Sequence, residues 1–184
     1  MESGFSLFDT GIGRCGIAWS SAGLSGMQLP EPDEARALSR LKRRFPDLEQ
    51  ADPPIWVQQA IDSVAAFLAG SITIDLGSIP IDLKSVGNWE QSVYRATRDI
   101  PVGSTITYGT LAERLGDPGM ARAVGQALGR NPWPIVIPCH RITAAGGRTG
   151  GFSASGGAAT KLKLLEIEGA LAAEAMPLFA PRDG

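Results

Sequence analysis

The sequence predicts an α/β (α+β) fold in two parts: a small N-terminal strand-plus-helix domain over residues 1–86 and a mostly helical domain over residues 87–184. Two observations support this prediction. Short β-prone runs between glycine turns fill the start of the chain, and they give way to apolar residues at helical spacing. The composition then changes near Ser85–Asn88, and 184 residues suffice for one mid-sized domain or two small ones.

Three short strands are expected at the start of the chain, over Phe5–Phe8, Gly16–Trp19 and Leu24–Leu29. Each run is rich in apolar or β-prone residues, and turns that contain glycine separate the runs. The pattern therefore predicts three strands joined by turns, ahead of the first helix.

Two helices and a linker complete the first part. One helix follows Asp33 with its apolar residues on one face, and a second runs from about residue 54 to residue 68. The stretch Ser71–Lys84 alternates in polarity but contains Pro80. Since proline is confined to sheet edges, we interpret this stretch as an edge strand and linker.

The net charge of −2 hides a difference between the two halves of the chain. Residues 1–86 carry 7 Lys and Arg against 11 Asp and Glu, whereas residues 89–163 carry nine basic residues against four acidic ones. An anionic partner is therefore expected to bind the second half.

The basic cluster at residues 40–44 is interpreted as a solvated helix face, with its cations near the negative end of the helix dipole.

The second half predicts a helix-turn-helix pair. Thr107 caps a helix that stops at Gly116, and Asp117 with Pro118 at the first helical position begins the next helix. Such pairs are common in helical domains and only some bind DNA. Arg122 strengthens the DNA-binding interpretation, because recognition helices present side chains near their start to a groove.

Two further helices flank this pair. One begins at Asn88, which forms a capping box with Gln91, and ends before Ile100. The other runs from about residue 158 to Glu168 and stops at Gly169. Between the pair and the last helix we expect a buried extended segment at residues 134–138, followed by a loop over residues 146–157 whose glycines let backbone approach a ligand.

Cys139 is the residue with the clearest chemical potential. A lone cysteine is usually buried and inert, and burial raises its pKa. Against that interpretation, the single histidine of the chain, His140, is its neighbour, and Arg141 follows. A His–Cys pair is a standard way to form a thiolate near neutral pH. Adjacent residues on an extended backbone point to opposite faces, so contact needs a bridging water or a turn after Pro138.

A third group is needed to orient the imidazole of His140. Glu166 and Glu168 are both candidates, because they lie in the last turn of the final helix. A carboxylate there faces the negative end of the helix dipole at a cost of about 0.3–1 kcal/mol. The residues thus predict a Cys-His-Glu nucleophile site beside a helix-turn-helix.

The segment Pro138-Cys139-His140-Arg141, with the preceding Asn131–Ile137, resembles the active-site signature of the O6-alkylguanine-DNA alkyltransferases, also called methylated-DNA–protein-cysteine methyltransferases. The likeness keeps a consistent order over about eighty residues of the chain. It includes Trp89, Ile100–Gly103, Thr107–Gly109, Ala121–Gly125 and Glu168-Gly169. The first half is similar only in its strand-then-helix layout. The resemblance implies that the second half is a winged-helix-like DNA-binding and active-site domain.

The resemblance implies DNA repair by direct reversal. Family members bind duplex DNA through the minor groove with little sequence preference and flip the damaged base into a pocket. They transfer the alkyl group of O6-alkylguanine, and also of O4-alkylthymine, irreversibly to a cysteine, so each molecule acts once and needs no cofactor. By this resemblance Cys139 is the acceptor, His140 the water-mediated base and Glu168 its orienting partner.

Further site residues are carried over from the family in the same way. Tyr108 matches the residue that crowds the phosphate and hydrogen-bonds the guanine. Arg122 matches the arginine that fills the space which the flipped base leaves in the duplex. Asn131 matches the residue that connects the recognition helix to the active-site segment. The loop after Arg141 is about two residues longer than the family pattern. The serine that contacts the O6 atom is therefore left open. The remaining residues implied to bind DNA or the base are Pro134, Ile142, Ser153 and Ser155.

Three other functions fit less well. A non-catalytic lesion-binding protein is the main alternative, but relatives of that kind lack the acceptor that Cys139 supplies. A regulator that senses alkylation through Cys139 is expected to carry additional DNA-binding modules. A cysteine hydrolase is the least favoured, because no surrounding motif matches one.

Location and cofactors follow from what the sequence lacks. No apolar run approaches the roughly 18 residues that a membrane span needs, and the N-terminus lacks the features of a signal peptide. Two cysteines and one histidine are too few for a structural zinc site, so Cys15 is expected to be a packed strand thiol and not a second acceptor. We expect a cytoplasmic monomer that binds duplex DNA, without metal, cofactor or membrane.

Overall fold

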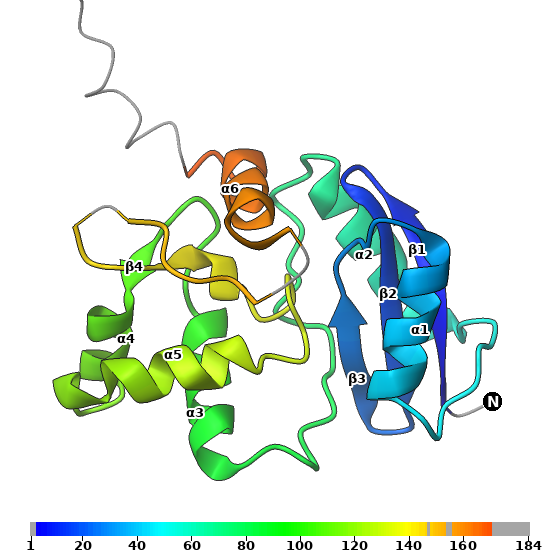
Figure 1. The fold of residues 1–184 in the computed structure, drawn as a ribbon, viewed down its shortest axis with the longest axis horizontal. Helices are drawn as coiled ribbons and strands as arrows, with labels where there is room; N and C mark the ends of the chain where they lie inside the picture. The colour runs from blue at the N-terminus through cyan, green and yellow to red at the C-terminus, as the bar shows by residue number, and fades with distance from the viewer. Residues whose placement is uncertain (1–2, 147, 154–155, 171–184) are drawn as a thin grey trace, which may run out of the picture.

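The computed structural model describes residues 3–146, 148–153 and 156–170, and it consists of a sheet half and a helical half (Figure 1). The predicted α/β (α+β) class is confirmed. No helix among these residues has both the length and the apolar character needed to cross a membrane. In chain order the elements are β1 (Gly4–Thr10), β2 (Gly13–Ser20), β3 (Gly23–Gln28), α1 (Glu34–Arg44), α2 (Ile55–Leu68), α3 (Asn88–Arg98), β4 (Ile106–Thr107), α4 (Tyr108–Arg114), the 3₁₀ turn η1 (Pro118–Met120), α5 (Ala121–Gly129), the 3₁₀ turn η2 (Cys139–Arg141), β5 (Ile142–Thr143) and α6 (Gly157–Ile167).

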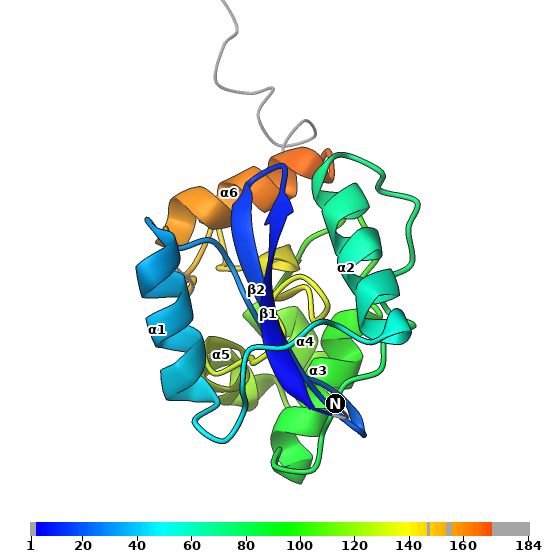
Figure 2. The same ribbon diagram turned by 90° about the vertical axis from the view of Figure 1, so that its right-hand side faces the viewer.

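The antiparallel sheet β1-β2-β3 has a helix on each face, α1 on one side and α2 on the other (Figure 2). On the α1 face, Leu41 packs with Phe5 and Ala18 in a small separate cluster. The α2 face belongs to the main core, which continues into the helical half. Because successive strand residues point to opposite faces, five consecutive residues of β2, Cys15–Trp19, are all buried.

The outer edge of β3 joins the two halves. The backbone N–H of Met27 donates to the carbonyl of Pro132 at 2.8 Å, and the Trp133 indole N–H donates to the carbonyl of Leu24 at 2.6 Å. The guanidinium of Arg44 spans the same joint, donating to the carbonyls of Met27 and Pro132 at 2.8 and 3.2 Å. These bonds pair an edge that would otherwise present unsatisfied backbone groups. Arg44 is therefore not on a solvated face, contrary to our expectation for the basic cluster.

Helices α3, α4 and α5 pack together, and α4 and α5 form the helix-turn-helix pair predicted from the sequence. Thr107 caps α4 by accepting from the N–H of Thr110 at 3.1 Å, and Asp117 accepts from the N–H of Gly119 at 2.8 Å. Gly116, with φ of 98°, makes the turn between them. Thr107 thus fixes the start of α4, as predicted, whereas Asp117 caps the 3₁₀ turn η1. Helix α5 follows this turn, with Met120 as its N-cap and no side-chain cap bond.

The stretch Ser71–Lys84 is not the edge strand that we expected. It forms turns, and its only β contact is a single bridge between Ile81 and Leu24. The side chain of Asp75 accepts from the N–H of Gly77 at 2.8 Å, and this local turn competes with strand pairing.

The predicted capping box at Asn88 is also wrong, by one residue. Gly87 is the N-cap and Asn88 is the first residue of α3. The Gln91 side chain donates instead to the carbonyls of Val86 and Leu83, at 2.9 and 3.4 Å. It therefore ties the helix to the preceding linker and does not cap the helix.

Candidate active site

The segment before Cys139 is buried, as predicted, but it is a tight turn and not extended. Pro134 bridges to Ile137, and the N–H of Ile137 donates to the carbonyl of Trp133 at 2.8 Å. Ile135 has φ of 77°, a conformation that β-branched residues rarely adopt. Two prolines and a buried apolar run stabilise this turn, and it leads into the 3₁₀ turn η2 that carries the cysteine.

The Cys139 thiol is held by Asn131. The Asn131 side-chain amide donates to Cys139 Sγ at 3.3 Å and to the carbonyl of Ile137 at 3.0 Å, while its oxygen accepts from the N–H of Trp133 at 2.9 Å. Burial raises the pKa of Cys139, while the Asn131 hydrogen bond and the positive charge of Lys161 act in the opposite direction. The amide of Asn131 therefore has both a fixed orientation and a fixed contact with sulfur.

Beside the thiol lies a buried ionic cluster centred on Glu168. Its carboxylate accepts from His140 Nε2 at 2.7 Å, from Arg141 Nε and Nη2 at 3.0 and 2.9 Å, and from the N–H of Gly103 at 3.3 Å. Burial raises the pKa of Glu168, but the hydrogen bonds from His140 and Arg141 outweigh this and lower it to about 2. The carboxylate is therefore ionised.

The environment of His140 favours the neutral imidazole. Its side chain is fully buried, and burial lowers its pKa despite the hydrogen bond to Glu168. With Nε2–H on the carboxylate, Nδ1 is left as an acceptor, and it has no partner among the residues that the structure describes. No hydrogen bond within those residues joins His140 to Cys139 directly. Such a ring nitrogen is suited to accept a proton.

Of the two candidate carboxylates at the end of α6, the structure brings Glu168 to His140 and leaves Glu166 on the surface. Among the described residues Glu166 pairs only with Lys163, at 3.0 Å, and both side chains are more than half exposed. Glu168 is the C-cap residue of α6, where the helix dipole opposes a negative charge. The cations and N–H groups around it offset that cost.

Two cavities meet at Cys139. The first has a volume of about 280 Å³, and Tyr108 lies in its wall with its hydroxyl donating to the carbonyl of Gly151 at 3.4 Å. The second, of about 200 Å³, shares Leu128, Gly129, Phe152 and Ser153 with the first and reaches α1. The other residues of the first cavity are Gly125 and Gly151, and the second adds Gln28, Leu29, Glu31, Arg40, Arg44, Arg130, Asn131 and Pro134. Cys139 is half-buried and lies in the walls of both cavities.

The other predicted residues lie at different depths. Pro134 is buried in the wall of the second cavity, and Ser153 is exposed at both cavities. Arg122 is exposed on the second position of α5, so it lies on the surface and not in a cavity wall. Ile142 is buried in β5, where it pairs with β4. Ser155 lies outside the described residues.

Our sequence reasoning missed two charged residues of the site, Arg141 as the clamp on Glu168 and Lys161. Lys161 is fully buried, and its ammonium donates to the carbonyl of Ile142. A signal was present, because Lys161 shares the helical stripe of Leu164, Leu165 and Glu168, at spacings of three, four and seven residues. A lysine on such a buried stripe indicates a specific acceptor or charge partner.

Cys15 lies apart from this site, buried in β2, where its sulfur contacts Thr10 Oγ1 at 3.8 Å. Burial raises its pKa to about 12, with the Thr10 contact acting in the opposite direction. In the described part of the chain, no group of three or more His, Cys, Asp and Glu side chains could hold a metal ion.

The family model for the 6-O-methylguanine DNA methyltransferase DNA-binding domain matches residues 88–170. The chain is 40% identical over 120 residues to the methylated-DNA–protein-cysteine methyltransferase of Mycobacterium bovis, covering 65% of this chain and 70% of that protein. It is 34% identical over 164 residues to the bifunctional transcriptional activator/DNA repair enzyme Ada of Escherichia coli. That match covers 89% of this chain but only 45% of the E. coli protein.

The fold is likewise similar to solved structures. The crystal structure of Mycobacterium tuberculosis OGT in complex with DNA has a TM-score of 0.72 and 31% sequence identity to this chain. The similarity covers 90% of this chain and 92% of that structure. It therefore extends over both the sheet half and the helical half.

Proposed function

The chain belongs to the methylated-DNA–protein-cysteine methyltransferase family, and from this premise we propose that it repairs alkylated duplex DNA by transferring the alkyl group of O6-alkylguanine to Cys139. The transfer is irreversible, so each molecule acts once. O4-alkylthymine is a second proposed substrate. The observation that carries the proposal is the Cys139 thiol, hydrogen-bonded by Asn131 where two cavities meet, next to the buried His140–Glu168 pair.

The proposed chemistry is an in-line displacement at the alkyl carbon. Nδ1 of His140 accepts the thiol proton through a water, and Glu168 stabilises the imidazolium that forms. Cys139 Sγ then forms the carbon–sulfur bond as the bond from carbon to O6 breaks, and the guanine leaves with one added proton. The product is a neutral thioether. No group described at the site activates that carbon–sulfur bond, which agrees with single use.

The proposed roles of the DNA-binding residues agree with their depths. Tyr108 in the first cavity is suited to hydrogen-bond a flipped guanine, and exposed Arg122 on α5 is suited to enter the duplex and fill the vacated space. Asn131 links the end of α5 to the thiol. We propose that α5 lies in the minor groove, as wedge-inserting proteins do, with little sequence preference. The remaining proposed contacts are Pro134, Ser153 and Ser155. The side chain of Ile142 is fully buried in β5 and lines neither cavity, so its depth does not agree with direct contact with the base.

In this proposal residues 87–184 form the alkyltransferase domain and residues 1–86 a supporting domain. The hydrogen bonds from β3 to Pro132 and Trp133 connect the first domain directly to the segment that leads to Cys139. The protein is proposed to act as a monomer on alkylated duplex DNA.

Mass spectrometry tests the proposal. The protein is incubated with a duplex that contains one O6-methylguanine, and both the intact protein and its peptides are weighed. We expect one added methyl group on the Cys139 peptide, no methylation in Cys139→Ala, and unchanged methylation in Cys15→Ala because that thiol is buried and protonated. An unmodified wild-type protein that still binds the damaged duplex would contradict the proposal and favour the non-catalytic lesion-binding alternative.

A further inference from the structure

The cations of the acidic first half are concentrated on one helix. Of the seven Lys and Arg residues in residues 1–86, five lie on α1: Arg36, Arg40, Lys42, Arg43 and Arg44. The helix dipole favours the three in the last turn. It does not favour Arg36, which lies in the first turn, where a positive charge faces the positive end of the dipole. The helix dipole therefore does not explain the whole set.

Three of these arginines line a single shallow hollow of about 400 Å³. Arg36, Arg40 and Arg43 are spaced by four and three residues, so they lie along one face of α1, and Ser39 adds a hydroxyl. Arg36 pairs with exposed Asp33 at 3.4 Å, and Arg40 pairs with Glu31 at 2.6 Å. Arg43 has no carboxylate within 4 Å among the described residues. The hollow thus has an excess of positive charge and a guanidinium available to an anion.

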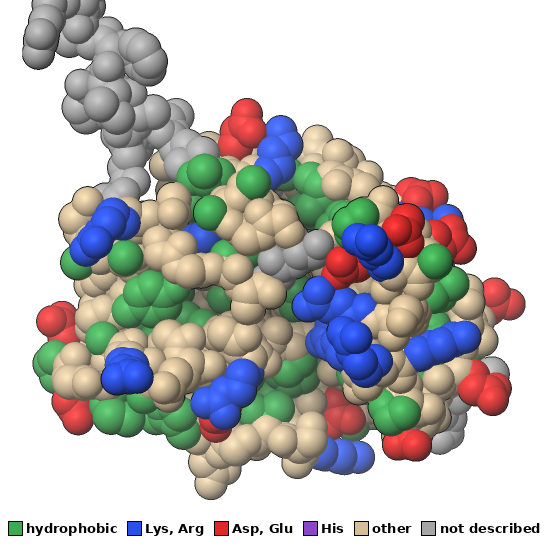
Figure 3. Space-filling view, in the orientation of Figure 1, with side chains coloured by type: hydrophobic (Ala, Val, Ile, Leu, Met, Phe, Trp, Pro, Cys, Tyr) green, Lys and Arg blue, Asp and Glu red, His purple; other side chains and the backbone are tan. Residues whose placement is uncertain are grey.

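This hollow adjoins the candidate active site. Arg40 and Glu31 line both the hollow and the cavity that contains Cys139. Helices α1 and α5 both lie on the face toward the viewer in Figure 1, at the right and the left of the molecule, and both lie on the left side in Figure 2. On that face, Lys and Arg side chains gather over α1 and recur over the helical half, while most Asp and Glu side chains lie toward the rim (Figure 3).

We propose that Arg36, Arg40 and Arg43 bind phosphates of the same duplex whose damaged base enters the active site. This extends the DNA interface from the helix-turn-helix onto the first half of the chain, and it rests on the proposed function. The chemistry suits the partner, because guanidinium groups bind phosphate bidentately and duplex DNA presents a dense row of phosphates. The first half of the chain then contributes to DNA binding as well as supporting the alkyltransferase domain.

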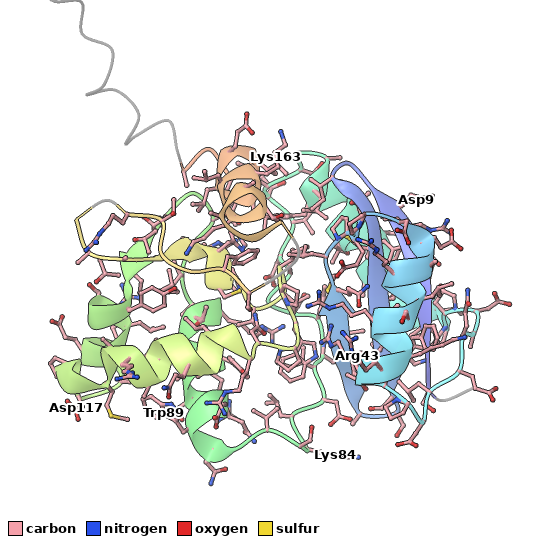
Figure 4. All side chains as sticks on the ribbon, in the orientation of Figure 1. Asp9, Arg43, Lys84, Trp89, Asp117 and Lys163 are labelled. Atoms are coloured by element: carbon pink, nitrogen blue, oxygen red, sulfur yellow. The ribbon has the colours of Figure 1, made fainter. Side chains whose placement is uncertain are left out.

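The test compares two single-charge variants on undamaged duplexes. Arg43→Gln removes the unpaired cation of the hollow, and Lys84→Gln removes an exposed cation of the same half at the lower edge of the molecule (Figure 4). We expect Arg43→Gln to weaken binding about 3- to 10-fold at low salt and to reduce the salt slope by about 1, with Lys84→Gln unchanged. The loss should appear only with duplexes long enough to pass from α5 to α1.

A third variant should have the opposite effect on DNA affinity. Glu31→Gln removes the one carboxylate in the wall of the hollow and frees Arg40, so binding should become tighter. The proposal would be overturned if wild type and Arg43→Gln had equal affinity and equal salt slope on every duplex. It would also be overturned if Arg43→Gln lost affinity only at protein concentrations where several protein molecules bind side by side on one duplex. Wild-type protein that neither binds DNA nor accepts a methyl group would overturn the proposed function itself.

Discussion

Replacing Glu168 by glutamine tests the ionic cluster behind the nucleophile, because it removes one charge and nearly preserves the shape. The carboxylate is 3% exposed and Arg141 is 7% exposed. Once the carboxylate is neutral, the Arg141 guanidinium is buried without its counter-charge, and the imidazole of His140 loses its ionic acceptor. Breaking a buried pair in this way costs about 3–5 kcal/mol.

That cost is large relative to the stability of a typical protein, which is about 5–15 kcal/mol. For a chain of this size, each kcal/mol lowers the melting temperature by roughly 2–4 °C, so Glu168→Gln should melt roughly 6–20 °C below wild type. Methyl transfer should also slow at a temperature where the variant is fully folded, because the imidazolium that forms on His140 no longer has a carboxylate to stabilise it. Urea unfolding and single-turnover transfer rates measure the two effects separately.

Glu166→Gln is the matched control, two residues earlier on α6. Glu166 pairs with Lys163 on the surface, and such exposed pairs contribute little, so the variant should stay within about 0.5 kcal/mol of wild type with unchanged transfer. A loss below about 1 kcal/mol for Glu168→Gln, or equal losses in the two variants, would refute the argument for a buried cluster.

Three further predictions follow from named contacts. Asn131→Ala removes the hydrogen-bond donor to Cys139 Sγ, so the thiol pKa should rise. The pH at which alkylation by iodoacetamide reaches half its maximal rate should rise with it. An unchanged pH dependence of this rate would count against the role of that bond. Trp133→Phe deletes the indole donor to the carbonyl of Leu24 and should cost about 1–3 kcal/mol in urea unfolding, while a neutral result would mean that the joint is weak. Acid should destabilise the protein, because the pKa of Glu168 in the fold, about 2, is below its ordinary value of 4.5; its stabilising contribution is complete above pH 4.5 and is lost as the pH falls toward 2. Unfolding curves at pH 7 and pH 3 check this, and Glu168→Gln should show a smaller difference between them.

The elements that sequence reasoning predicted well are those with local signals. Thr107 begins α4 and Asp117 begins the 3₁₀ turn before α5 through bonds within a few residues, and Gly116 makes the turn between them, so the helix-turn-helix pair was visible in the sequence. The turn before Cys139 was missed because its shape depends on packing. Nothing in a proline-bounded apolar run indicates that Ile135 adopts a positive φ.

The site shows the same division between local and long-range information. The sequence placed Cys139 and His140 together, but helix position alone left both Glu166 and Glu168 as candidate carboxylate partners, and only the family resemblance favoured Glu168. Only the tertiary packing, which brings Arg141 and the N–H of Gly103 to one of them, distinguishes the two. The role of Arg44 at the joint between the halves was hidden for a similar reason, since its acceptors are backbone carbonyls distant in sequence.

The most direct test of the central claim is a titration of the protein with an excess of duplex carrying O6-methylguanine, with repaired guanine counted when the reaction stops. The account predicts a plateau at one guanine repaired per active protein molecule, with no further repair on prolonged incubation. Continued repair beyond that ratio would contradict irreversible transfer to Cys139. A plateau at zero with intact, folded protein would contradict the alkyl transfer itself.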